Sequence, residues 1–209
     1  MALGKSIFEE QINNLKSFIE INIKNKGKEP AVVFATLVVK KTIEILYTAS
    51  YAYTNKLYDV LFSLIRMLQD NCLAIEAASE LGFKSYMTYI GNNEPINTKT
   101  IPPKYRDNNP NNPNNLMTDG HLRDMVGKRY KGFSNLYRAT SRSIHFNGQS
   151  FNLIMRKNED DKRELYFEIG NKGQDYKEQF QNAVNIIITL SKIIFDMLHN
   201  SPELDLLTK

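Results

Sequence analysis

Residues 31–53, AVVFATLVVKKTIEILYTASYAY, are apolar on most sides of a predicted helix of about six turns. Gly27 ends the segment before it, and Pro30 suits the first turn of a helix because its missing N–H is not needed there. A helix that is apolar nearly all round must be covered by other elements. We therefore expect residues 31–53 to form the central helix of a bundle.

Helical patterns continue on both sides of this stretch. In residues 6–24, apolar side chains recur at three- and four-residue steps, which predicts an amphipathic helix. A glycine, Gly82, supplies the stop for another helix. The further helices are expected over 56–81, 83–90, 120–126, 133–146 and 176–200. The predicted fold class is mainly α, a helical bundle of five or more helices that forms a single domain over residues 1–209.

Two segments do not fit a helical pattern. Residues 92–119 contain the run NNPNNPNN and further prolines, which disfavour helix and strand alike and predict a long irregular loop. A surface insertion is favoured over a flap that covers a site. Residues 150–156 and 164–169 alternate apolar and polar side chains around an acidic turn, which predicts a small β-hairpin insertion near 150–169.

The composition is that of a soluble globular protein, with 42% hydrophobic and 24% charged residues among 209. The formal net charge is only +4, but residues 121–145 alone carry +5. Such a concentrated basic segment is typical of a protein that binds a polyanion, although a solvated surface explains it as well. Its charged residues are Arg123, Asp124, Lys128, Arg129, Lys131, Arg138 and Arg142.

The single cysteine, Cys72, excludes an intramolecular disulfide and a multi-cysteine metal site. It lies in apolar sequence and is expected to be buried and inert. Charged residues interrupt residues 1–10, so no signal peptide is expected, and the apolar stretch 184–198 is too short to span a bilayer. A cytoplasmic protein without membrane contact is the expectation.

The sequence YRATSRSIH, residues 137–145, carries the clearest chemical signal. At about 100° per residue, Arg142 lies roughly 40° and His145 roughly 20° from Arg138 around the helix axis, and Ser141 lies about 60° away. Arginines match phosphate oxygens with forked donors, and a histidine can transfer a proton near neutral pH. The pattern predicts a face that binds or acts on a phosphate.

The spacing from Arg138 to His145, Arg-x6-His, resembles the signature of the HEPN superfamily, a group of helical bundles in which four to six residues separate Arg from His. Tyr137, Ser141 and His145 are each four residues apart. This spacing is also similar to the pattern Tyr-x3-Ser-x3-His in a group of uncharacterised bacterial helical proteins. The HEPN resemblance implies RNA cleavage without a metal or other cofactor, and two motifs that share a cleft in a homodimer. It also implies a toxin or anti-phage defence setting, with an antitoxin or another protein as a partner.

On this hypothesis Arg138 and His145 are the catalytic pair. Arg66 and Asp70 are four residues apart, a spacing that predicts a same-face ion pair, and they orient the catalytic pair from a neighbouring helix. Phosphate or RNA is held by Tyr137, Ser141, Arg142, Lys128, Arg129 and Lys131. One departure from the HEPN pattern is Ala139, at a position where the superfamily commonly has a polar residue.

Two alternatives stay open. Ala139 favours a non-catalytic helical module that holds a nucleic acid, a nucleotide or a protein partner on the same basic face. The cluster could instead be an internal polar network of an inert scaffold. In that case His145 caps its helix, and the basic side chains pair with Asp70 or Glu76.

Other chemistries lack their patterns. His121 and His199 have no neighbouring metal-ligand spacing, so no metal site is predicted. Glycine-rich phosphate loops are missing, which argues against P-loop and Rossmann nucleotide sites. The strand-turn-helix elbow of serine hydrolases is missing too, so acyl transfer by Ser141 is not expected.

Overall fold

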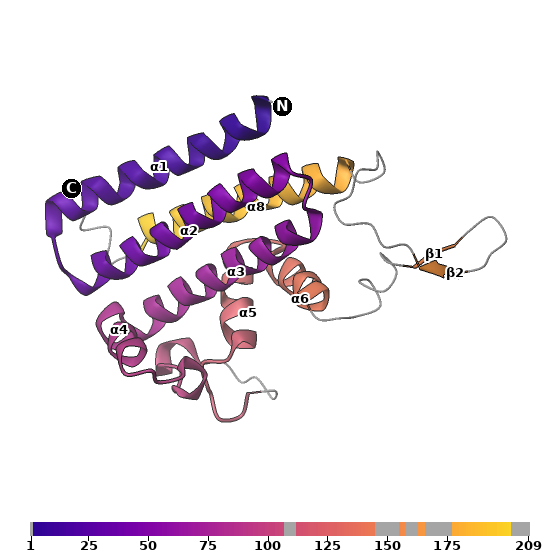
Figure 1. Cartoon of the computed structure of the whole chain (residues 1–209). Coiled ribbons are helices and arrows are strands. Elements are labelled where there is room, and N and C mark those ends of the chain that lie inside the picture. Colours follow the sequence, from indigo (N-terminus) through magenta and orange to yellow (C-terminus); the bar gives the residue numbers. More distant parts are fainter. Residues whose placement is uncertain (1, 107–111, 145–154, 158–162, 166–176, 202–209) are drawn as a thin grey trace.

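The computed structural model describes residues 2–106, 112–144, 155–157, 163–165 and 177–201 (Figure 1). In these residues the fold is a helical bundle, as predicted from the hydrophobic patterns. The helices follow the expected segments within a few residues at each end. They are α1 (Ala2–Lys26), α2 (Pro30–Thr54), α3 (Tyr58–Leu81), α4 (Phe83–Gly91), α5 (Asp119–Arg129), α6 (Phe133–Ile144) and α8 (Lys177–His199).

Helices α1, α2, α3 and α8 pack side by side as a bundle, and α4, α5 and α6 lie against α3 (Figure 1). The most central helix is α3, which contacts α2, α4, α5, α6 and α8. The sequence predicted that residues 31–53, which lie in α2, would form the central helix. One side of α2 is instead open to solvent, where Leu37, Tyr47 and Tyr51 are exposed. Apolar residues around a helix therefore did not show how many neighbours would cover it.

Glycines fix two of the connections. Gly82, at φ 84°, separates α3 from α4, and Gly132, at φ 91°, separates α5 from α6. This left-handed conformation costs little without a Cβ. The helix expected over 120–126 continues through Gly127 to Arg129 as α5. The reason for glycine there is space, because an added Cβ would lie 3.3 Å from Cβ of Ser134 and still closer to its hydroxyl.

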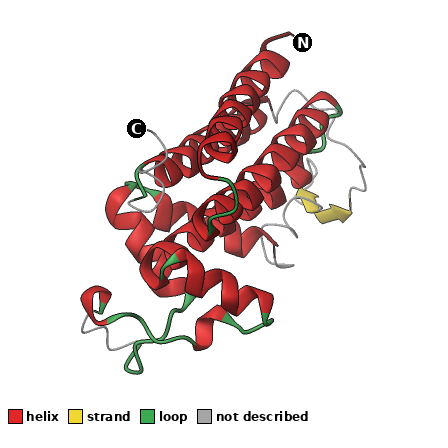
Figure 2. Ribbon diagram, turned by 90° about the vertical axis from the view of Figure 1, so that its left-hand side faces the viewer, coloured by secondary structure: helices red, strands yellow, loops and turns green. Residues whose placement is uncertain are grey.

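The described parts of the 92–119 loop belong to the packed fold. Ile101 and Met117 are buried, and Thr100 forms an antiparallel bridge with Leu116. Two short 3₁₀ turns, η1 (Ile96–Thr98) and η2 (Pro103–Tyr105), precede that return, among the loops in the lower part of Figure 2. This differs from the expected surface insertion, because Ile101 and Met117 belong to the hydrophobic core of the bundle.

Two three-residue strands, β1 (Met155–Lys157) and β2 (Arg163–Leu165), pair antiparallel with Arg156 opposite Glu164. The residues between and around them lie outside the described part of the chain. A β-hairpin over the whole of 150–169 therefore remains a prediction.

Helix α8 is the one described helix with a segment, Phe180–His199, long and apolar enough to cross a membrane by length and composition. It packs against α3, α1 and α2, where Ile187, Ile194 and Leu198 are fully buried. These contacts are those of a core helix. Cys72, also fully buried as expected, lies in α3.

Candidate functional site

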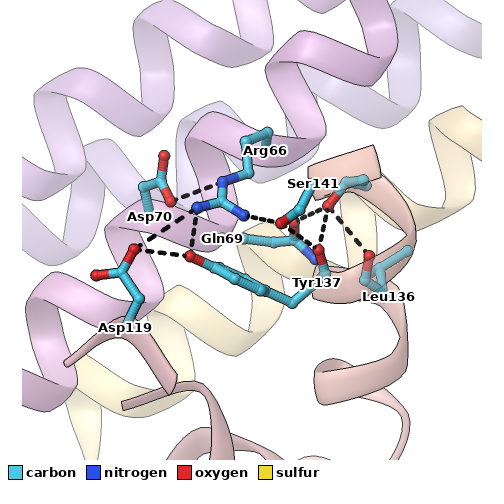
Figure 3. Close-up of polar contacts among 8 residues, drawn as sticks. Arg66, Gln69, Asp70, Asp119, Leu136, Tyr137 and Ser141 are labelled. Atoms are coloured by element: carbon cyan, nitrogen blue, oxygen red, sulfur yellow. Dashed lines mark hydrogen bonds and ion pairs between the residues drawn. The ribbon is translucent and has the colours of Figure 1, made fainter. Parts of the chain in front are cut away.

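Arg66 on α3 holds the inner side of α6 (Figure 3). Its Nη1 donates a hydrogen bond to Oγ of Ser141 at 2.5 Å, and its Nη2 donates to the hydroxyl of Tyr137. Cζ of Arg66 lies 3.8 Å from the centroid of the Tyr137 ring. One guanidinium thus contacts two successive turns of α6 through residues four apart. The sequence predicted Arg66 as an orienting group but not these two partners.

Two carboxylates flank the same guanidinium. Nε of Arg66 lies 3.0 Å from Oδ1 of Asp70, the i,i+4 ion pair expected from the sequence. Asp119, the first residue of α5, places Oδ2 4.0 Å from Nη2 and accepts a hydrogen bond from the Tyr137 hydroxyl at 3.2 Å. Arg66, Asp70 and Asp119 together carry a formal charge of −1. This network joins α3, α5 and α6 in one polar cluster.

The pKa values of two groups in the cluster are raised. Burial, and then the nearby Asp119 carboxylate, raise the pKa of Tyr137 to about 12. Its hydroxyl therefore stays protonated at neutral pH and remains a donor. Burial also raises the pKa of Asp70, although the charge of Arg66 opposes the shift. Asp70 is thus easier to protonate than an ordinary surface aspartate.

A second buried contact reinforces the packing of α6 on α3. Thr140 donates from Oγ1 to Oε1 of Gln69 at 2.6 Å, and both side chains are buried. Nε2 of Gln69 has no hydrogen-bond partner among the described residues. Sequence reasoning assigned no role to Thr140 and considered Asp119, like Thr118, only as a possible cap of the helix near residue 120. The cap is Thr118, whose Oγ1 accepts from the backbone N–H of His121.

The basic residues of the 121–145 segment fall into two groups. Arg129 forms an ion pair with the buried Glu76 on α3, one of the pairings that the scaffold alternative expected. Arg123 makes two hydrogen bonds to its neighbour Asp124. The side chains of Lys128, Lys131 and Arg138 are exposed, and that of Arg129 is half exposed despite its ion pair. Lys128 lies 3.4 Å from the sulfur of Met125.

Arg138 is exposed on α6, next to the inward-facing Tyr137. Arg142 belongs to the same helix, but its side chain and the whole of His145 lie outside the described residues. The structure therefore brings Tyr137, Ser141, Arg66 and Asp70 together. The closeness of Arg138 to His145 stays a prediction from their spacing.

His121 is buried against a different carboxylate. Its Nε2 lies 2.9 Å from Oε2 of Glu80, and both side chains are almost completely buried. Among the described residues, no group of three or more His, Cys, Asp and Glu side chains is arranged to hold a metal ion.

The comparisons with known proteins found no family model, no curated protein and no solved structure that matches this chain.

Proposed function

We propose that this chain is an HEPN-like endoribonuclease that cleaves single-stranded RNA without a metal ion, with Arg138 and His145 as its catalytic pair. The observation that carries the proposal is the setting of α6. Contacts to Arg66 and Gln69 turn Tyr137, Thr140 and Ser141 toward α3, and Arg138 is left exposed on the same helix. An arginine held at a fixed position suits phosphate binding.

In the proposed reaction, the 2′-hydroxyl of a nucleotide attacks the adjacent phosphorus. The new bond joins O2′ to phosphorus, and the bond from phosphorus to O5′ breaks. His145 removes the proton of the 2′-hydroxyl or supplies the proton that O5′ needs, and water exchanges the other. Arg138 donates to the phosphoryl oxygens, where negative charge accumulates in the transition state. The products are a 2′,3′-cyclic phosphate and a free 5′-hydroxyl.

The surroundings of Arg138 support the binding of an RNA backbone. Lys128 and Lys131 are exposed at the end of α5 and in the turn that leads to α6. Lysines at such positions attract the phosphates that flank a cleavage site. In the proposal Arg142 adds a further positive charge. The homodimer and the defence setting rest on the HEPN resemblance, and the cytoplasmic location rests on the sequence pattern; all three are part of the proposal.

The test incubates purified protein with unstructured RNA in EDTA, beside His145→Ala and Arg138→Ala. Wild type should cleave, and each variant should lose at least about a hundredfold of the rate, the size of a lost acid–base or charge-stabilising group. Lys104→Ala, an exposed lysine outside the basic segment, is the matched control and should cleave normally. Equal cleavage by wild type and His145→Ala would refute the catalytic assignment.

A second function, RNA binding without cleavage, is favoured by one observation. Arg66 already occupies the hydroxyls of Tyr137 and Ser141, two groups that the sequence assigned to phosphate. If the second function holds, RNA stays intact at any protein concentration. Affinity should still fall steeply with salt, and Arg138→Ala should reduce the slope of log K against log salt by about one.

A further inference from the structure

A cavity of about 290 Å³ opens beside the Arg66 network, between α3, α4, η1 and the start of α5. Leu73, Ala77, Tyr86, Met117 and Leu122 form its buried, apolar part. Its polar lining consists of Arg66, Asp70, Asn97 and Asp119. The described part of the 92–119 loop thus contributes a wall of this cavity.

The polar side of the cavity offers hydrogen-bond acceptors. Oδ1 of Asp70 faces Nε of Arg66, and Oδ2 of Asp119 accepts from Tyr137. Among the described residues, none donates a hydrogen bond to Oδ2 of Asp70 or to Oδ1 of Asp119. The Asp119 side chain is 71% exposed and that of Asp70 is 47% exposed, so both can reach a ligand. Since the formal charge of the cluster is −1, the cavity disfavours a phosphate and favours a donor.

A nucleobase has the chemistry that these walls require. Its flat faces suit an apolar cavity, and its Watson–Crick edge makes hydrogen bonds to side chains when the base is unpaired. Guanine is the best match, because its N1–H and 2-amino group lie side by side and can donate together to one carboxylate. Uracil presents a single N–H between two carbonyl oxygens, which a carboxylate repels. The amide of Asn97 can donate to acceptors elsewhere on the base.

We propose that this cavity is a subsite for an unpaired guanine of the bound RNA, with Asp119 as the principal acceptor and Asp70 beside it. The assignment rests on the proposed action on RNA. The Arg66 network then links the two sites, since Tyr137 contacts Asp119 in the cavity and is the neighbour of Arg138 in α6. A base in the cavity and a phosphate at Arg138 then belong to one strand, and cleavage acquires a guanine preference.

Calorimetric titration with nucleosides tests the subsite without any phosphate. Guanosine should bind about tenfold or more tightly than uridine, the ratio expected for one bidentate contact, and inosine, which lacks the 2-amino group, should lie between them. Asp119→Asn should abolish this preference. Asp124→Asn, on the same helix but paired with Arg123, is the matched control and should retain it.

Ala74→Leu provides a second variant, because Ala74 lines the cavity and is outside the polar network. It should lower guanosine affinity about tenfold while Tyr137 and Asp119 keep their contacts. Equal affinities for guanosine and uridine, or no binding at millimolar concentration, would overturn the subsite. Tighter binding of agmatine, a guanidinium compound, would overturn it as well and assign the cavity to a cationic side chain.

The outcomes separate this proposal from the nuclease. A wild type that cleaves RNA at all bases equally and ignores guanosine refutes the subsite alone. A wild type that binds guanosine but neither cleaves nor binds RNA refutes the proposed function, and with it the guanine of an RNA strand as the natural ligand.

Discussion

The guanidinium of Arg66 lies over the ring of Tyr137, with Cζ 3.8 Å from the ring centroid, and donates to the hydroxyl of the same residue. Ser141, one turn further along α6, accepts from the same group. Because Arg66 is on α3, the central helix, this contact determines which side of α6 faces the bundle. The exposure of Arg138 follows from it.

Arg66→Ala should lower the free energy of unfolding by about 2–4 kcal/mol, since it removes charged hydrogen bonds to Tyr137 and Ser141 and leaves Asp70 without its cation. Urea unfolding measures the change. The matched control is Lys40→Ala, which breaks an i,i+4 ion pair with Glu44 whose side chains are both largely exposed. Its effect should stay under about 0.5 kcal/mol. Similar losses in both variants would contradict the network's role.

Thr140→Val should cost about 1–3 kcal/mol, because it leaves the buried amide of Gln69 without its hydroxyl donor. Thr48→Val is the control, since Thr48 is exposed and bonds only a backbone carbonyl of its own helix. That variant should unfold within about 0.5 kcal/mol of wild type. A neutral Thr140→Val would show that the contact does not hold α6 on α3.

Gly127→Ala should destabilise the protein by about 1–3 kcal/mol, because the new methyl group would displace Ser134 and separate α5 from α6. The displaced hydroxyl also donates to the carbonyl of Arg123. Gly91→Ala, at the end of α4 with open space around it, should be neutral or slightly stabilising. Thermal unfolding of the two variants compares them directly.

Two aspartates should contribute to stability with opposite dependence on pH. The pKa of Asp70 is raised in the folded protein, chiefly by burial, so its contribution is fully present below the unfolded value and is lost as the pH rises through the folded pKa. A hydrogen bond from Arg123 lowers the pKa of Asp124. Its contribution is therefore present above the unfolded value and lost as the pH falls through the folded pKa.

Unfolding of wild type, Asp70→Asn and Asp124→Asn between pH 3 and pH 7 checks these signs. Relative to Asp70→Asn, wild type should lose stability as the pH rises. Relative to Asp124→Asn, it should gain stability over the same range. Slopes of the same sign for both comparisons would contradict the assigned environments.

The hydrophobic periods predicted the helices because each has its own local pattern of apolar residues and stop signals. The Arg66–Asp70 pair was predictable for the same reason, since both residues lie on one helix. Contacts between side chains that are distant in the sequence could not be predicted in this way. Asp119 meets Tyr137 only because Gly132 turns α6 back along α5, and no spacing in the sequence encodes that approach.

The buried loop was equally hard to predict. Residues 92–119 are dominated by proline, asparagine and other polar residues, and only the burial of Ile101 and Met117 shows that they anchor the loop. Two apolar residues in a polar segment form no repeating hydrophobic pattern from which their burial could be predicted. The cavity wall that this loop supplies could therefore be found only in the folded chain.

The chemical ends of the RNA fragments test the central claim most directly. Attack by the 2′-hydroxyl at Arg138 and His145 predicts that wild type in EDTA produces 2′,3′-cyclic phosphate and 5′-hydroxyl ends. Arg138→Ala should produce almost none, whereas Lys104→Ala should match wild type. Fragments with 5′-phosphate and 3′-hydroxyl ends, or the same cyclic ends from Arg138→Ala at the wild-type rate, would contradict the account.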